Sequence, residues 1–305
     1  FRPGSSAHDA LRALNRVVYR GQVNWILEAD IVSFFDSIDR KMLQEMLQKR
    51  VLDGSVKRLV GKCLNVGVLD GEVFTKPDEG TAQGSIISPL FGNVYLHNVL
   101  DVWFESEIRP TLCGKARLIR YADDFVIGFE TQADAVRVKE LLTQRFAGYG
   151  LSLHPEKTRL FKFQRPAGSW AGEEALDSFD FLGFTCYWKR TRKGRWEMTL
   201  KTRRARLSQA IGRIYDWCRD HRHLPIAEQH DALKRRLRGH INYFGVNGNR
   251  RSLTQVVFQA AESWFKWLCR RSQKARLTWE RFKDLLRDFP LPAPKIRVQI
   301  WGVVP

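Results

Sequence analysis

The stretch of sequence that decides the fold reads Ala116-Arg117-Leu118-Ile119-Arg120-Tyr121-Ala122-Asp123-Asp124-Phe125-Val126-Ile127-Gly128-Phe129 (residues 116–129). Two strand-like runs, residues 116–121 and 125–129, flank the adjacent acids Asp123 and Asp124. This pattern predicts a β-hairpin whose tip carries the two carboxylates. Hairpin turns commonly contain Asp for conformational reasons, so the pair alone does not identify a site.

A third acid, Asp30, ends another apolar run, residues 23–31, which also reads as a strand. Carboxylates held close together repel one another, and partial burial raises that cost, so a cation is the usual counter-charge. Oxygen ligands from two strand ends suit Mg²⁺, which binds few carboxylates and adds water and substrate phosphates. Two such ions about 3.5–4 Å apart can activate a 3′-hydroxyl and stabilise a leaving pyrophosphate, as nucleotidyl transfer requires.

Helical patterns alternate with these strands. Residues 39–51 carry apolar side chains on one helical face, and Ser88-Pro89 reads as an N-cap with Pro at the first position of a long apolar helix toward Glu107. Residues 131–149 form an amphipathic pattern closed by Gly150. This order predicts an α+β fold with helices packed on one face of a largely antiparallel sheet.

The charge is divided unevenly along the 305 residues. Residues 1–184 hold 23 Lys and Arg against 24 Asp and Glu, a net charge of −1, whereas residues 185–305 hold 28 against 9, a net charge of +19. From Leu200 onward, basic amphipathic helices are predicted near residues 203–222, 226–244, 252–272 and 278–289. Such asymmetry is expected when one part does chemistry and the other holds a polyanion.

An anionic membrane surface is the alternative partner for the basic part, but Gly, Pro and acidic interruptions disfavour it. No apolar stretch approaches the roughly 18–20 residues that a membrane span needs. The cysteines are too far apart in the sequence to indicate a zinc site or a redox pair. Scattered, reduced thiols of this kind are expected of a cytoplasmic protein. They are Cys63, Cys113, Cys186, Cys218 and Cys269. The start, Phe1-Arg2-Pro3-Gly4, lacks Met and reads as a cut inside a longer protein.

Five motifs in order resemble those of reverse transcriptases. The tetrad Tyr121-Ala122-Asp123-Asp124 is similar to their active-site tetrad, and Asp30-Ile31-Val32-Ser33-Phe34-Phe35-Asp36 to their first catalytic-aspartate motif. Residues 81–90, 150–158 and 179–184 resemble the other three. Residues 1–10, 237–244, 271–273 and 277–282 are similar to segments of the bacterial group II intron-encoded branch, so the resemblance covers nearly the whole chain.

The resemblance implies a right-hand polymerase palm with partial fingers in residues 1–187 and a basic helical thumb or maturase (X) domain in residues 188–305. It implies a cytoplasmic RNA-directed DNA polymerase that uses two Mg²⁺ ions and acts on an RNA template, a DNA primer and dNTPs, with no membrane partner. Group II intron RNA and target DNA would be its further partners, and it would assist splicing and mobility. Two alternatives remain open: a domesticated reverse transcriptase associated with CRISPR or phage-defence genes, and an RNA-binding maturase without polymerase activity.

The same resemblance implies roles for individual residues. Asp30 and Asp123 would ligate both metals, Asp124 would complete the acidic site, and the carbonyl of Ile31 would add an oxygen. Phe35 would sit beneath the sugar and clash with a 2′-hydroxyl, with a plain core residue as the alternative.

Gln83 and Gly84 would line the nucleotide pocket. Lys157 would meet the triphosphate or protonate pyrophosphate, with a solvated lysine as the alternative. Arg2 would reach the incoming phosphates or support the fold. Residues 181–183 would steady the primer terminus. Phosphate contacts in the basic part are expected from Arg203, Arg204, Arg206, Arg235, Arg236, Arg238, Arg250 and Arg251.

Three departures from the family pattern qualify these expectations. Ala82 stands where the family more often has Pro, which makes the rigidity of that turn less certain. The chain begins inside the finger region, so upstream segments that close over the template are expected to be missing. It ends at Pro305 without a His-, Cys- and Asn-rich module, so no DNA endonuclease is expected in it.

Overall fold

The computed structural model describes residues 4–19, 23–64, 68–70, 73–75, 86–166, 177–271 and 277–301. The chain forms two compact units. The first comprises Phe1–Asp177 with Gly194–Trp196, and the second comprises Ser178–Lys193 with Glu197–Pro305. The boundary expected between residues 187 and 188 falls inside a strand of the second unit, and the assignment of the two parts as palm and thumb stays a prediction.

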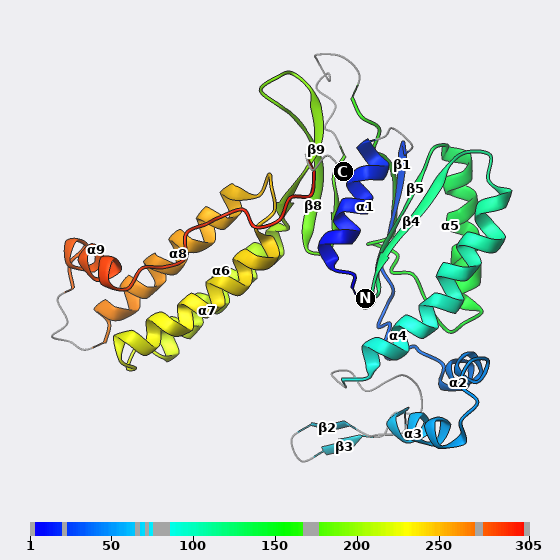
Figure 1. Cartoon of the computed structure of the whole chain (residues 1–305), viewed down its shortest axis with the longest axis horizontal. Helices are drawn as coiled ribbons and strands as arrows, with labels where there is room; N and C mark the ends of the chain where they lie inside the picture. Colours follow the sequence, from blue (N-terminus) through cyan, green and yellow to red (C-terminus); the bar gives the residue numbers. More distant parts are fainter. Residues whose placement is uncertain are drawn as a thin grey trace. The chain divides into compact units, whose positions relative to one another are not determined.

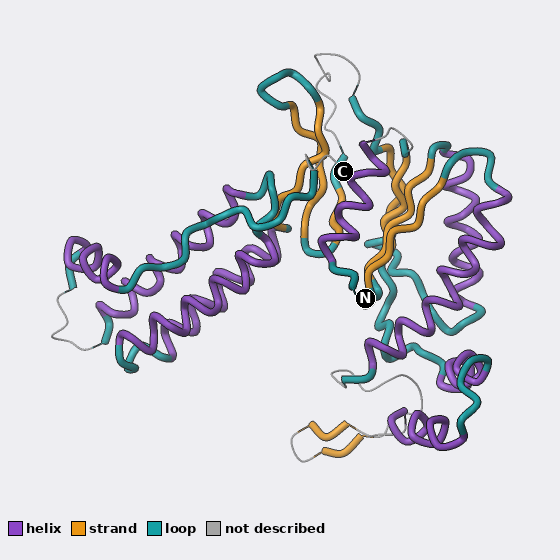
Figure 2. The backbone as a smooth tube through the Cα atoms, viewed as in Figure 1, coloured by secondary structure: helices purple, strands orange, loops and turns teal. Residues whose placement is uncertain are grey.

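The first unit is built on a four-stranded sheet in the order β4-β5-β1-β6 (Figures 1 and 2). The strands are β1 (Trp25–Ala29), β4 (Ala116–Tyr121), β5 (Asp124–Phe129) and β6 (Arg159–Lys162). Every neighbouring pair is antiparallel. The predicted hairpin is therefore confirmed, with Asp124 as the first residue of its second strand.

Helices cover one face of this sheet, as the α+β expectation requires. Alternate residues of β1 and β5, among them Leu27 and Ile127, join Val138 and Phe146 of α5 (Gln132–Ala147) in one buried core. The same core includes side chains of α2 (Arg40–Gln48) and α4 (Ser88–Leu96). Helix α1 (Ala7–Tyr19) packs beside β4 and lies on the other side of the sheet in Figure 1.

Local capping determines where these helices begin. Asp39 accepts a hydrogen bond from the Met42 N–H at the start of α2, and Thr131 accepts one from the Asp134 N–H at the start of α5. The predicted N-cap at Ser88 is wrong by one residue, because the helix already includes Ser88 and its cap is Ile87. Beyond α4 the chain stays helical but widens to π-helix over His97–Val102 and Phe104–Ile108, with a 3₁₀ turn at Arg109–Thr111.

Three further elements of the first unit lie after α2 in the chain. They are α3 (Gly54–Leu64) and the two-stranded pair β2 (Val68–Asp70) and β3 (Val73–Thr75). Their antiparallel pairing sets Val68 opposite Thr75. These elements were not predicted from the sequence.

The second unit combines a three-stranded sheet with four helices among the residues that the structure describes. The strands are β7 (Phe179–Phe181), β8 (Phe184–Arg190) and β9 (Trp196–Thr202). The helices are α6 (Arg204–Asp220), α7 (Ile226–Phe244), α8 (Arg250–Cys269) and α9 (Trp279–Asp288), close to the four predicted ranges. Their shared core centres on Trp264 and Phe282, and Trp264 donates to the buried amide oxygen of Gln229 at 2.9 Å.

Across the described ranges, no helix combines the length and apolar character that crossing a bilayer demands. The five cysteines are all free.

A buried carboxylate ties α5 to the loop that leads into β4. Asp134 accepts hydrogen bonds from the N–H groups of Gly114 (2.8 Å) and Cys113 (3.2 Å) and from the Thr131 hydroxyl (2.8 Å). Burial opposes the charged form, but these hydrogen bonds outweigh it and lower the pKa of Asp134 below its ordinary value of 3.8. The carboxylate therefore contributes stability that is complete above that ordinary pKa and is lost as the pH falls through the folded-state value.

We expect Asp134→Asn to lower the free energy of unfolding at neutral pH by roughly 1–3 kcal/mol, because charged hydrogen bonds are lost. The decline of stability in acid should also become shallower than in the unsubstituted chain. Urea unfolding at several pH values measures both effects. Glu140→Gln, an exposed change on the same helix, serves as the control, and an equal effect from it would contradict the role of Asp134.

Candidate active site

Neighbouring strand ends bring the three predicted acids to one end of the first unit's sheet. Asp30 directly follows β1, and Asp123 lies in the two-residue turn between β4 and β5. β1 and β5 are antiparallel with Ala29 opposite Phe125, so one further step of the same register sets Asp30 opposite Asp124. Figure 1 shows the three strands side by side. Acids 93 and 94 positions apart in the sequence thus become neighbours.

The carboxylates are neighbours without converging on one point. Within the ranges that the structure describes, no group of three or more His, Cys, Asp or Glu side chains could hold a metal ion. Asp123 and Asp124 are exposed, and the carboxylate of Asp30 accepts a hydrogen bond from Nζ of Lys157 at 2.7 Å. The donor chemistry fits Mg²⁺, since accessible carboxylate oxygens on adjacent strand ends leave room for water and phosphate.

The chain after Asp30 explains how Lys157 reaches it. Ile31 forms an antiparallel bridge with Leu153, the Val32 N–H donates to the Ser152 carbonyl at 2.9 Å, and the His154 N–H donates to the Asp30 carbonyl at 2.8 Å. These bonds align the segment that carries Lys157 beside the end of β1. Two predicted site residues from separate motifs, Asp30 and Lys157, therefore form an exposed ion pair.

A partly buried arginine supports the turn that carries Asp123. The Arg120 guanidinium makes two hydrogen bonds to the carboxylate of Asp101, at 2.7 and 2.5 Å, and donates to the Asn93 side-chain oxygen at 3.1 Å. It also donates to the carbonyl of Ala122 at 2.7 Å. Ala122 has a φ of +57°, which costs free energy for a residue with a Cβ. Arg120 thus holds the turn in a conformation that the turn would not favour alone.

Sequence reasoning missed this support. Arg120 directly precedes the tetrad, and Asp101 is the one acid between Ser88 and Phe104 in a largely apolar helical stretch. A lone acid in such a stretch is a signal of a buried partner. The sequence does not reveal which cation is that partner.

Phe35 lies in the turn that follows Asp30 and is half-buried against the core. Its ring centroid is 5.1 Å from that of Phe34, and both rings approach Gly92 of α4. A Cβ at Gly92 would lie 2.8 Å from the Phe34 ring and 3.2 Å from the Phe35 ring, so glycine permits this close packing. The half-buried position leaves both predicted roles of Phe35, sugar contact and core residue, as predictions.

Several predicted site residues lie outside the described residues. They are Arg2, Gln83 and Gly84, together with most of the motif at residues 81–90, including Ala82. Their roles stay predictions from the resemblance.

The arginines predicted to contact phosphates in the second unit have different surroundings. Arg203 pairs with Asp180 at 2.9 Å, and Arg206 donates to Gln209 at 3.5 Å. Arg236 stacks on Trp217, with its guanidinium carbon 4.4 Å from the ring centroid, and burial lowers its pKa. The others are exposed on the helices: Arg204, Arg235, Arg238, Arg250 and Arg251.

The turn between β7 and β8, predicted to steady a primer terminus, is supported by α7. Leu182 has a φ of +53°, and its carbonyl accepts a hydrogen bond from the Tyr243 hydroxyl at 3.0 Å. The ring of Phe184 stacks on that of Tyr243, with centroids 5.9 Å apart. Tyr243 lies in the segment 237–244 that carries part of the resemblance, but its role as a support for this turn was not predicted.

Known proteins resemble this chain in sequence. The family model described as "Reverse transcriptase (RNA-dependent DNA polymerase)" matches residues 1–186. Protein YkfC of Escherichia coli is 28% identical over 225 residues, covering 64% of this chain and 56% of that protein. Group II intron-encoded protein LtrA of Lactococcus lactis is 37% identical over 99 residues, covering 32% of this chain and 16% of that protein. The chain thus spans about half the length of the first relative and less of the second.

Among solved structures, apo telomerase from Candida tropicalis, truncated from the C-terminal domain, has a TM-score of 0.46 at 16% sequence identity. The match covers 59% of this chain and 38% of that one.

We expect Asp101→Ala to lower the free energy of unfolding by roughly 3 kcal/mol, because Arg120, whose side chain is 8% exposed, loses its carboxylate. Asp101→Leu combined with Arg120→Met should recover most of that loss. Asp284→Ala, which breaks the exposed pair with Arg287, is the control and should cost less than about 1 kcal/mol. Equal costs for Asp101→Ala and Asp284→Ala in urea unfolding would show that Arg120 does not depend on Asp101.

Proposed function

This chain belongs to the reverse transcriptase family, and from that membership we propose that it is an RNA-directed DNA polymerase that extends a DNA primer with dNTPs. The observation that carries the proposal is the strand register, which sets Asp30 opposite Asp124 and beside the turn that carries Asp123. Acids on adjacent strand ends suit a site that receives metal-bound phosphates. The basic second part of the chain would bind the nucleic acid.

Within the site, Asp30, Asp123 and Asp124, with the Ile31 carbonyl, would hold two Mg²⁺ ions. When bound, such ions activate the primer 3′-hydroxyl and stabilise the leaving pyrophosphate. Arg120 keeps the Ala122–Asp123 turn in place through its hydrogen bond to the Ala122 carbonyl. Lys157, already beside Asp30, would contact the triphosphate of the incoming nucleotide.

The proposal extends to a group II intron role, with intron RNA and target DNA as partners and splicing as a second activity. Two observations support it: the relative LtrA is named as a group II intron-encoded protein, and residues 185–305 carry a net charge of +19. Binding of structured RNA with a steep salt dependence is the property that this charge favours.

We expect the chain to extend a DNA primer on an RNA template with Mg²⁺ and dNTPs, and Asp123→Ala to reduce the rate at least roughly 100-fold. The loss should exceed that typical of a change at a residue that only hydrogen-bonds to a metal ligand, because Asp123 is proposed to bind the metal directly. Glu140→Gln, exposed on α5, is the control and should keep the parental rate. Primer extension by the Asp123→Ala variant at the parental rate would contradict the assignment of Asp123 to the metal site.

We expect Phe35→Ala to lower the preference for dNTPs over rNTPs roughly tenfold or more, because a ring that clashes with the 2′-hydroxyl is removed. Single-nucleotide incorporation with each substrate measures kcat/KM for both. If Phe35 is only a core residue, both values should fall together and the ratio should stay constant. A thermal melt of the variant separates that outcome from a selective change.

A further inference from the structure

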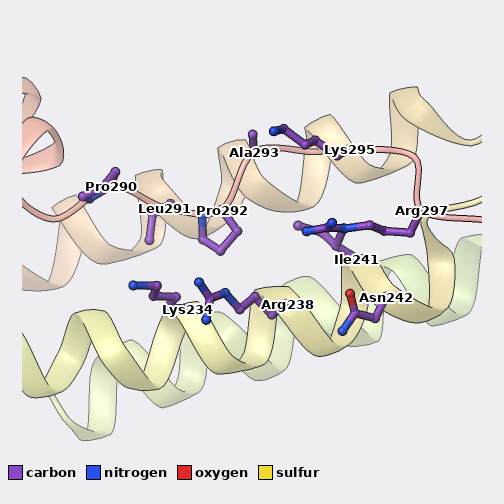
Figure 3. A pocket seen from close by; sticks show the side chains of 10 residues that line it. All are labelled: Lys234, Arg238, Ile241, Asn242, Pro290, Leu291, Pro292, Ala293, Lys295 and Arg297. Carbon is purple, nitrogen blue, oxygen red and sulfur yellow. The ribbon is translucent and has the colours of Figure 1, made fainter.

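In the second unit, the chain after α9 runs back along α7 as an extended strap, residues 290–301 (Figure 3). Its start is fixed by a 3.0 Å hydrogen bond between Nε2 of His230 and the carbonyl of Pro290. Near its end, the N–H groups of Arg297 and Val298 donate to the carbonyl of Gly245, at 2.6 and 3.0 Å. The strap is therefore held against α7 at both ends.

The close approach at Gly245 depends on the absence of a side chain. A Cβ there would lie 2.2 Å from the Ile241 carbonyl oxygen and 3.1 Å from the Lys295 carbonyl oxygen. Asn247 adds a second anchor, since its side-chain oxygen accepts from the Ile300 N–H at 2.8 Å. The space between strap and helix is thus built by specific contacts rather than left by loose packing.

That space is a groove of about 340 Å³, toward the small end of ligand pockets. Lys234, Arg238 and Asn242 follow one another at four-residue intervals, so they line one side of α7. Lys295 and Arg297 lie two positions apart on the strap, and both line the groove. Figure 3 shows the Arg297 side chain extending between strap and helix, beside Ile241. Four cations from two elements therefore line one groove, with no acid among its lining residues.

Some basic residues of the second unit are already engaged with partners inside the unit. Arg203, Arg219 and Arg287 pair with carboxylates, and Arg271 donates to two backbone carbonyls. Across the ranges that the structure describes, the side chains of Lys234, Arg238, Lys295 and Arg297 make no ion pair or hydrogen bond. Like charges gathered around a groove repel one another, and an anion that enters it removes that repulsion.

The remaining lining specifies more than a phosphate ion. Pro290, Leu291, Pro292 and Ala293 form an apolar wall, and Asn242 offers an amide that can donate and accept. A sugar and an unpaired base can contact such a wall while the phosphates on either side meet the cations. A duplex would keep its bases stacked on one another, away from the wall. Proteins that follow a single strand combine a basic groove for the backbone with aromatic side chains for the bases. Here an aliphatic wall takes the place of the aromatic side chains.

We infer that the groove between α7 and the strap binds a single-stranded segment of nucleic acid, with Lys234, Arg238, Lys295 and Arg297 contacting its phosphates. This inference rests on the proposed function in one respect, namely that the polyanion which the protein meets is a nucleic acid. The groove would anchor the nucleic acid at a site whose residues are separate from Asp30, Asp123 and Asp124.

The test measures binding of fluorescein-labelled oligouridylate and oligothymidylate by anisotropy at a series of salt concentrations. Arg238→Gln with Arg297→Gln removes two groove cations, both exposed, so folding should be unaffected. The magnitude of the slope of log K against log salt should fall by roughly 1.4, about 0.7 for each lost phosphate contact on a single strand. Arg281→Gln with Lys283→Gln, exposed cations of α9 outside the groove, should leave the slope unchanged.

An unchanged slope in the groove variant, or an equal fall in both double variants, would overturn the site. So would displacement of the oligonucleotide by inorganic phosphate at constant ionic strength, which would indicate a site for a free anion. If the slope falls on oligouridylate alone, the groove is specific for RNA. If the slope falls equally on both probes, the groove accepts single-stranded RNA and DNA alike. Primer extension is scored separately, so an inactive chain that still shows the slope change contradicts the polymerase proposal and leaves the groove standing.

Discussion

The antiparallel pairing of β1 with β5 is the constraint on which the candidate site depends. It sets Ala29 opposite Phe125, so the residue after β1 and the turn before β5 must lie at the same end of the sheet. Side chains alternate along a strand, and a shift of one residue would turn the buried Leu27 and Ile127 toward the other face. The hydrophobic core therefore fixes the register, and the register brings the acids together. The β1–β5 pairing therefore both buries the core side chains and positions the acids of the candidate site.

Strain accompanies this arrangement. The non-glycine residues with positive φ in the described ranges are Ser33, Ala122 and Leu182, and each lies in a segment that the reverse transcriptase motifs singled out. Two of the three are held by a hydrogen bond to their carbonyl, Ala122 by Arg120 and Leu182 by Tyr243. Surrounding contacts that hold an unfavourable backbone conformation are typical of functional turns. In both cases the supporting side chain comes from an element packed beside the turn or from the strand leading into it.

Arginines of the second unit have different structural roles. Arg236 stacks on Trp217 and Arg203 pairs with Asp180, so these guanidinium groups are already engaged within the unit. Arg238, two positions from Arg236 on α7, lines a groove together with Lys234 of the same helix and with Lys295 and Arg297 of the strap. Helical periodicity separates the two side chains by about 200° around the axis. A high density of Arg and Lys thus serves both internal packing and an open surface.

The sequence by itself determined the α+β class, the acid-bearing hairpin, the approximate helices of the basic part and the family, which the match over residues 1–186 confirms. These features depend on local periodicity, turn residues and motif order, all of which can be read along the chain. Only the tertiary structure decided that Lys157 pairs with Asp30, that Asp101 serves Arg120, and that Lys295 joins Arg238 in one groove. Those partners lie 127, 19 and 57 positions apart, and no local pattern selects them. Their pairing follows from strand register, from the packing of helices on the sheet and from the hydrogen bonds that hold the strap along α7.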